Sequence, residues 1–436
     1  MKRLLSILAT SVFSVATVSS TVSCMPQKPI EDKKSPLNIG LDIDKTKAID
    51  TSVDPLTHKG FTNFFIIGDS LSDVDGLTSY VKDKFIVKTG LEKYVNFNLS
   101  IEGSYGYVDD QNVHHNAFSN GPTTAYNIAN NFGFKDLKPS NKYSVLKDEK
   151  QGYGKNYSIG GATAAKIAPQ AGGIILNDVS IEEQARTLVT QQKISSNDFV
   201  LFEIGGNDLF SMISSQKAGD NKKVIDYMNE SITRLRNALF TLLNNGIKNL
   251  FFLGPPIMDN IPSYANKTDE EKKEIIDLGK EYELKMQQVV KEVNSYYSSN
   301  FKFSSLYEGE NSLTVLQKGY GEHILSNGLI QNIDEYKNNQ SFTKNLKIKL
   351  NDKEINTSQV KNLKFDENIY KKLTMKSDKV EANVVVELIG KESYSNLKER
   401  DQLMSKYFFT DIVHPTKVVH EYVAEILQEK ILKEFG

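Results

Sequence analysis

The sequence has a single cysteine, no tryptophan and no excess of basic charge. One cysteine among 436 residues excludes an internal disulfide, because a disulfide needs a second thiol. The 53 Lys and Arg residues are balanced by 55 Asp and Glu residues, and the formal net charge is −2. The chain therefore lacks the basic field that draws proteins to nucleic acid, and we expect no nucleic-acid partner. Hydrophobic residues at 39% and charged residues at 25% are typical of a globular chain.

The N-terminus predicts a secretory signal over residues 1–23. Lys2 and Arg3 form a short basic start, residues 4–18 are apolar and small, and residues 19–23 are small and polar. The apolar stretch is too short and too rich in Ser and Thr for a transmembrane helix. We therefore treat this segment as separate from the fold.

The position of Cys24, directly after the signal, resembles the lipid-modified cysteine of a bacterial lipoprotein. Thr21 departs from that motif, which usually has leucine there. A diacylglyceryl anchor on Cys24 would hold the protein on the extracytoplasmic face of the cell membrane. The alternative is a cysteine beside an ordinary cleavage site, in a secreted protein. Residues 24–58 are rich in Lys, Asp, Pro and Thr, and we interpret them as the anchor cysteine and a flexible tether.

From residue 59 to residue 436, short apolar runs alternate with segments of helical periodicity. The runs are typical of buried strands, and the longer segments carry one apolar face. The expected strands are 64–67, 199–204 and 250–253, and the expected helices are 122–131, 180–192 with a capping box at its start, 224–243 and 268–297. Strands that alternate with helices predict a mostly parallel sheet between two helical layers, an α/β fold.

Residues 325–400 interrupt this alternation. The segments 345–350 and 380–389 are strand-like, and the loops between them are rich in Lys, Asn and Ser. We expect a β-rich insertion without catalytic motifs. It is either a lid that sets substrate choice or a surface excursion, which costs little for a long loop.

The most informative position is Ser70, which stands on a turn directly after an apolar strand. Open α/β folds place their sites at such strand ends. Three more polar turns follow along the chain, namely Gly160-Gly161-Ala162, Gly205-Gly206-Asn207-Asp208 and Asp411-Ile412-Val413-His414-Pro415. Each turn taken alone is an ordinary turn, loop cap or helix cap. Their joint occurrence, mostly at strand ends, predicts a site.

These residue types supply the parts needed for acyl transfer. Ser70 offers a nucleophilic hydroxyl, and His414 can accept its proton. Asp411, three residues before His414, can hold the far ring nitrogen of the imidazole and fix its tautomer. Ser70 and Gly161 through backbone N–H groups, and Asn207 through its amide, can donate to an oxyanion. The adjacent His114 and His115 are more typical of a solvated loop than of a metal pair.

The four turns, in this order, resemble the blocks of the SGNH (GDSL) esterase/lipase family, and Phe118-Ser119-Asn120-Gly121 resembles a helix start of its lipase/phospholipase branch. The resemblance covers residues 60–310 and 405–436. It implies a three-layer, flavodoxin-like fold, with Ser70 as nucleophile, His414 as base and Asp411 as orienting acid. It places Gly161 and Asn207 in the oxyanion hole and implies no metal or cofactor. The loop after Ser70 has one residue more than is usual.

We therefore expect a membrane-anchored ester hydrolase that acts on acyl lipids through an acyl-enzyme. Two alternatives stay open. One is a carbohydrate O-deacetylase that uses the same site, and the other is a lipoprotein that only binds ligand or adheres. Intact Ser70, Asn207, Asp411 and His414 argue against the second alternative.

Overall fold

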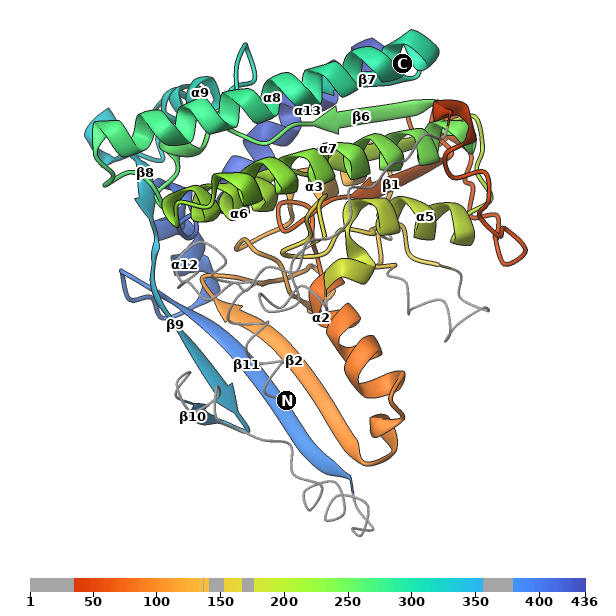
Figure 1. Cartoon of the computed structure of the whole chain (residues 1–436). Helices are drawn as coiled ribbons and strands as arrows, with labels where there is room; N and C mark the ends of the chain where they lie inside the picture. Colours follow the sequence, from red (N-terminus) through yellow and green to blue (C-terminus); the bar gives the residue numbers. More distant parts are fainter. Residues whose placement is uncertain (1–34, 136, 141–152, 167–175, 356–378) are drawn as a thin grey trace.

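The computed structural model describes residues 35–135, 137–140, 153–166, 176–355 and 379–436 (Figure 1). The predicted signal segment and Cys24 lie outside these ranges. Within them, no helix combines the length and the apolar character needed to cross a membrane.

The centre of the fold is a parallel sheet of four strands in the order β1-β5-β6-β7. The strands are β1 (Asn63–Ile67), β5 (Asp198–Glu203), β6 (Asn249–Leu253) and β7 (Phe301–Ser304). All three pairings are parallel. A parallel bridge between Ile66 and Asn156 adds a short fifth segment beside β1. The three strands expected from the sequence are confirmed, and so is the mostly parallel sheet.

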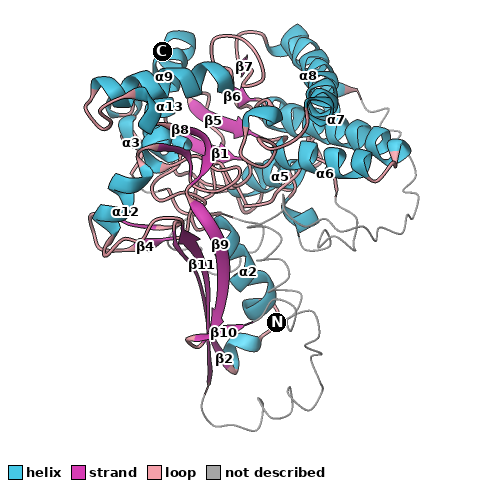
Figure 2. Cartoon of the chain, turned by 90° about the vertical axis from the view of Figure 1, so that its left-hand side faces the viewer, coloured by secondary structure: helices cyan, strands magenta, loops and turns pink. Residues whose placement is uncertain are grey.

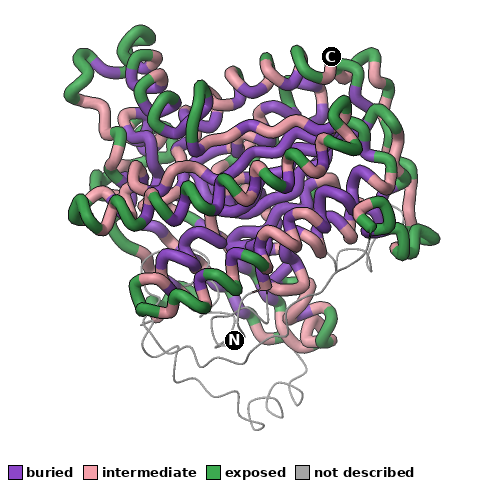
Figure 3. The backbone as a smooth tube through the Cα atoms, turned by 45° about the horizontal axis from the view of Figure 1, so that its top comes forward, coloured by how far each residue is buried: buried purple, intermediate pink, exposed green. Residues whose placement is uncertain are grey.

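Helices cover both faces of this sheet, which confirms the three layers (Figure 2). Alternate side chains of each strand point to opposite faces. Phe65, Ile67, Val200 and Phe202 therefore join one core with α5 (Ile181–Gln191), α7 (Asn221–Asn244) and α8 (Asp269–Tyr297). Phe64, Ile66, Phe199 and Leu201 join a second core with α3 (Thr124–Asn131) and α13 (Lys417–Phe435). Figure 3 shows the resulting buried centre.

The helix limits agree with the sequence to within a few residues. A capping box starts α8, in which Thr268 and Glu271 each accept a hydrogen bond from the other's backbone N–H. The capping box predicted at Ser180 is wrong, because the Ser180 side chain makes no cap bond to α5. The remaining described helices are α2 (Gly76–Lys82), η3 (Asp83–Val87), α6 (Gly206–Lys217), α9 (Leu313–Ser326) and α12 (Leu397–Met404), with the short turns Pro36–Asn38, Pro55–Thr57, Leu91–Lys93, Asn177–Val179, Met258–Asn260 and Ile333–Glu335.

The insertion is β-rich, as predicted, but it does not form a sheet on its own. Its strands β9 (Thr343–Leu350), β10 (Lys353–Ile355) and β11 (Val380–Gly390) combine with β2 (Val95–Gly103) in the order β10-β9-β11-β2. β11 lies parallel to β2, with Val380 opposite Val95. This second sheet extends away from the central layers (Figures 1 and 2).

The insertion also pairs with the strand that leads into the last sequence block. β8 (Lys337–Ser341) runs parallel to β12 (Tyr407–Phe409). The backbone N–H of Thr343 donates to the carbonyl of Thr410 at 2.8 Å. None of the described residues between 325 and 400 lines the cavity beside Ser70. In its described part the insertion therefore contacts the segment that leads into the Asp411–His414 loop. Residues 356–378 lie outside the described ranges, and the choice between a lid and a surface excursion stays a prediction.

The flexible tether predicted up to residue 58 is wrong for residues 36–58. Ile39 is buried, and the Asn244 amide of α7 donates to the carbonyls of Pro36 and Ile39 at 2.8 and 2.9 Å. Ile49 forms a parallel bridge with Gln192 at the end of α5. Backbone carbonyls make most of these contacts, so the polar composition of the segment did not reveal its docking. The tether prediction remains only for residues 24–34, which lie outside the described ranges.

Candidate active site

A glycine and a glutamine shape the turn that carries Ser70. Gly68 exchanges two hydrogen bonds of 2.9 Å with the Gln184 side chain of α5. A Cβ on Gly68 would lie 2.8 Å from the carbonyl oxygen of Glu203, so only glycine fits beside β5. The Asp69 carboxylate accepts the Leu71 N–H at 3.1 Å and closes the turn. Ser70 therefore leaves the strand at a fixed angle and lines a cavity.

The loop after Ser70, which is one residue longer than usual, is held by hydrogen bonds to Asp73. Asp73 accepts the N–H groups of Gly76 and Leu77 at 2.6 and 2.9 Å, which caps the start of α2. Its second oxygen also accepts the Gly160 N–H at 2.6 Å. Asp73 thus links the loop after Ser70 to the Gly160-Gly161-Ala162 turn.

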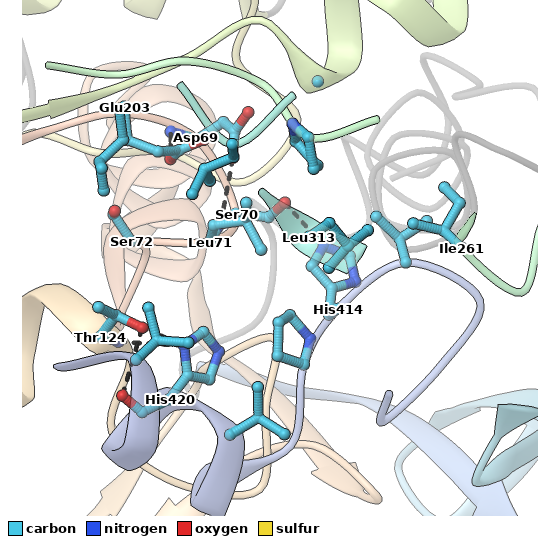
Figure 4. Close-up of a pocket in the computed structure, with 18 of the residues that line it drawn as sticks. Asp69, Ser70, Leu71, Ser72, Thr124, Glu203, Ile261, Leu313, His414 and His420 are labelled. Atoms are coloured by element: carbon cyan, nitrogen blue, oxygen red, sulfur yellow. Dashed lines mark hydrogen bonds between the residues drawn. The ribbon is translucent and has the colours of Figure 1, made fainter. Parts of the chain in front are cut away.

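His414 and Asp411 lie on the loop after β12, and the structure brings both to Ser70. His414 Nε2 is 2.7 Å from Ser70 Oγ (Figure 4). Its Nδ1 is 3.0 Å from Asp411 Oδ2. Asp411 Oδ1 accepts the backbone N–H groups of Val413 and His414 at 2.8 and 2.6 Å. A single turn therefore presents the carboxylate and the imidazole in the relative positions that the spacing predicts.

The Asp411 carboxylate stays ionised although it is buried. Burial acts to raise its pKa, but the charge of His414 and the hydrogen bonds from His414 and Tyr105 outweigh it and lower the pKa below its usual value of 3.8. An ionised Asp411 can hold the Nδ1–H of His414 and leave Nε2 free to accept a proton.

Asn207 lies beside this group, at the start of α6. Its Nδ2 donates to the carbonyl of Ala162 at 3.0 Å and to Asp69 Oδ2 at 3.3 Å. Asn207 lines the same cavity as Ser70 and His414. The amide is therefore oriented by contacts with both the first and the second sequence block.

Gly161 lies on a turn whose two sides, at Ile159 and Ala162, are hydrogen-bonded to neighbouring segments. Ile159 N donates to the Gly68 carbonyl at 3.2 Å, and Ala162 accepts from Asn207. Gly161 has a φ of +81°, a left-handed conformation that favours glycine. Among the described residues no acceptor is recorded for its N–H, whereas Gly160 donates to Asp73. Gly161 is not among the residues that line the cavity, so its predicted role stays a proposal.

Two buried carboxyl groups lie beneath the Ser70 turn. Glu203 Oε2 accepts the Asp69 backbone N–H at 3.3 Å. Burial raises the pKa of Asp69 to about 6. Burial, together with the nearby Asp69 charge, raises the pKa of Glu203 well above 4.5. Burial thus favours the protonated form of Glu203. No sequence motif marks this residue.

The cavity beside Ser70 has a volume of about 120 Å³ and a mostly apolar lining. Its polar residues, among them Ser70, Asn207 and His414, lie together, and apolar side chains enclose the rest. Figure 4 shows Ser70 and His414 facing each other near Leu313 and Ile261. The apolar residues of this lining include Leu71, Phe210, Met258, Ile261, Leu313 and Leu316.

The paired histidines lie away from this site, on the short strand β4 (His114–His115), which pairs with β3 (Tyr107–Val108). His115 Nδ1 is 2.7 Å from Asp75 and its Nε2 is 3.3 Å from Asp109. These hydrogen bonds to Asp75 and Asp109 raise the pKa of His115. No cluster of three or more potential metal ligands occurs in the described ranges. The histidines form part of a hairpin and not the solvated loop that we expected.

Residues 64–427 match the model of a family described as GDSL-like Lipase/Acylhydrolase. The chain belongs to the GDSL-like lipase/acylhydrolase family. The GDSL match begins in β1, ends in α13 and includes the insertion. It supports an enzyme that acts on esters. A search of curated proteins finds no match.

Proposed function

We propose that this GDSL protein is a serine hydrolase that cleaves acyl esters through an acyl-enzyme on Ser70. The observation that carries the proposal is the continuous contact from Ser70 Oγ through the His414 ring to Asp411, with heavy-atom distances of 2.7 and 3.0 Å. These are hydrogen-bond distances suited to proton transfer.

In this mechanism His414 Nε2 takes the Ser70 proton as Oγ attacks the acyl carbonyl carbon. The ester C–O bond then breaks, and His414 returns the proton to the leaving alcohol. Water next attacks the acyl-enzyme with His414 again as base, which releases the acid and restores Ser70. Asp411 holds Nδ1–H through both steps.

The Ser70 and Gly161 N–H groups and the Asn207 amide are the proposed oxyanion donors. Both contacts of the Asn207 amide in this structure are to protein acceptors, and the one to Asp69 is the longer at 3.3 Å. Donation to an oxyanion would replace that longer contact, and the contact to Ala162 would keep the amide in place.

The apolar cavity favours a lipid-like acyl group over an acetyl group on a sugar. An acetyl group would leave most of about 120 Å³ of apolar space unused, whereas each buried methylene contributes roughly 0.8 kcal/mol. We also propose that Cys24 is lipidated and places the enzyme on the extracytoplasmic face of the cell membrane, near lipid substrates.

A panel of p-nitrophenyl esters, phospholipids and acetylated sugars tests the proposal. We expect turnover of the aliphatic esters by the wild type and none by a folded Ser70→Ala variant. Ser180→Ala is a matched control, because this buried serine does not line the cavity. Turnover by Ser70→Ala would contradict the proposal, and a preference for acetylated sugars would favour the deacetylase.

A further inference from the structure

A tyrosine hydroxyl completes the hydrogen bonding of the Asp411–His414 pair. Tyr105 Oη donates to Asp411 Oδ2 at 2.5 Å and lies 2.8 Å from His414 Nδ1. Tyr105 is almost fully buried, and its ring contacts His414 and Phe118 edge-on. The hydroxyl can thus donate to the carboxylate and share the Nδ1–H of the imidazole with Asp411 as a second acceptor.

The Tyr105 hydroxyl stays protonated and remains a donor. Burial and the adjacent Asp411 charge raise its pKa well above the usual 10.0. A hydrogen bond from a neutral donor to an ionised acceptor is among the stronger ones in proteins. This bond therefore restricts the carboxylate that orients the base.

The loop that carries Tyr105 is fixed by a buried arginine of the insertion. Arg400, on α12, is 2% exposed. Its Nη1 donates to the carbonyls of Gly103 and Gly106 at 2.9 and 3.0 Å, one on each side of Tyr105. Its Nη2 donates to the carbonyl of Asn120 at 3.1 Å. Nη1 also lies 3.5 Å from the carbonyl oxygen of Tyr105 itself, so one guanidinium contacts four carbonyls of two segments.

This arrangement is specific to arginine. A guanidinium has five N–H donors in a planar fork, whereas an ammonium has three on a flexible stem. Asp401 offsets the buried charge, at 2.8 Å from Nη2, and also accepts from the Asn120 amide at 2.9 Å. Burying a cation costs free energy unless it is paired and hydrogen-bonded. Arg400 meets both conditions, because it is paired with Asp401 and donates hydrogen bonds to backbone carbonyls.

The insertion holds the same loop a second time through β11. The Ser104 N–H donates to the carbonyl of Leu388 at 2.9 Å. On the opposite side, Thr343 bonds to Thr410, directly before Asp411. The insertion therefore fixes both Tyr105 and the residue that Tyr105 binds.

We propose that Tyr105 is a positioning residue for the Asp411–His414 pair and that Arg400 of the insertion holds Tyr105 in place. The inference rests on the proposed function, since it assigns Tyr105 a part in that reaction. Tyr105 touches neither Ser70 nor the cavity, so it acts through Asp411 and His414.

Steady-state kinetics of Tyr105→Phe on a p-nitrophenyl ester test this role. The variant keeps the ring and loses only the hydroxyl. We expect kcat to fall about 10- to 100-fold, the effect of one hydrogen bond to a charged group, with KM changed less than about twofold. Tyr107→Phe is the matched control on the same segment, because no described residue bonds to its hydroxyl.

A double-mutant cycle with Asp411→Asn separates positioning from a general loss of structure. If Tyr105 acts through Asp411, Tyr105→Phe lowers kcat much less in the Asp411→Asn background than in the wild type. Equal, multiplicative losses in both backgrounds would overturn the inference. Arg400→Lys should reproduce the kcat loss with KM retained, and unchanged kcat in a folded Arg400→Lys variant would remove Arg400 from the account.

Ester turnover by the wild-type protein separates a failure of the inference from a failure of the proposed function. Wild-type turnover with an unchanged kcat in Tyr105→Phe would overturn the inference alone. A wild type without any ester turnover would overturn the proposed function and the inference together.

Discussion

The size of the apolar cavity predicts how the rate depends on acyl chain length. A water molecule occupies roughly 30 Å³ in the liquid, so the cavity of about 120 Å³ has room for at least about four groups of that size. A methylene is similar in size to a water molecule, so we expect the cavity to hold an acyl chain of at least about four carbons. Each methylene that enters contributes roughly 0.8 kcal/mol, or about a fourfold gain in kcat/KM.

A series of p-nitrophenyl esters from acetyl to hexadecanoyl measures this dependence. We expect kcat/KM to rise about fourfold per methylene from the acetyl ester. The gain should level off once the cavity is filled, beyond about four carbons. Leu313→Trp should move the plateau to shorter chains, because Leu313 lines the cavity beside Ser70. Leu284→Trp is the control, since Leu284 is 52% exposed on α8.

Two results would refute this reasoning. A maximum at the acetyl ester would show that acyl chains do not enter the cavity. An unchanged plateau in a folded Leu313→Trp variant would show that the chains bind elsewhere. Thermal melts must accompany the kinetics, because overpacking can cost about 1–3 kcal/mol of stability.

Further predictions concern single residues. Asn207→Ala should lower kcat by about 10²–10³ with a smaller change in KM, as for other oxyanion donors; a defect confined to KM would assign Asn207 to ground-state binding. Glu203→Gln should keep kcat within about threefold, because burial favours the neutral form of Glu203, which a glutamine side chain resembles in shape and charge. Since the folded protein holds the Glu203 proton to a higher pH than the unfolded chain, the free energy of unfolding falls as pH rises above about 4.5. Glu203→Gln lacks this fall, so denaturant titrations should show its stability relative to the wild type increasing with pH, and a constant difference would contradict the assignment. Cys24→Ser should release the protein from the detergent phase or block its processing, and metabolic labelling with an alkyne fatty acid that misses Cys24 would refute lipidation.

The sequence predicted the parts of the site that depend on local pattern. An apolar strand before Ser70 and three residues from Asp411 to His414 are both short-range signals. Ser70 Oγ and His414 Nε2 meet at 2.7 Å although Ser70 follows β1 of the central sheet and His414 follows β12, which pairs with β8 in a separate sheet. The helices were located for the same reason, because their apolar periodicity extends over many residues.

The sequence did not predict which strand of the core pairs with the insertion. β2 has strict alternation, with apolar Val95, Phe97, Leu99 and Ile101, and this pattern could have identified the strand. Its partner, β11, begins at Val380, and nothing in either strand specifies a pairing over so long a separation.

The residues that support the site also lacked a sequence signal. Tyr105 and Arg400 belong to no motif, and their roles follow from contacts between segments far apart in the chain. In the sequence, Glu203 is the one acid at the end of an apolar strand. Only the folded structure brings it beside Asp69, where the two form a buried acid pair. Residues 36–58 dock through backbone carbonyls, which side-chain composition does not report.

The most direct test of the central claim is mass-spectrometric mapping of the residue that a fluorophosphonate labels. We predict one modified peptide, with the adduct on Ser70, and labelling that is lost in His414→Gln because Ser70 Oγ then lacks its base. Labelling at another serine, or no labelling of a folded protein that hydrolyses esters, would contradict the account.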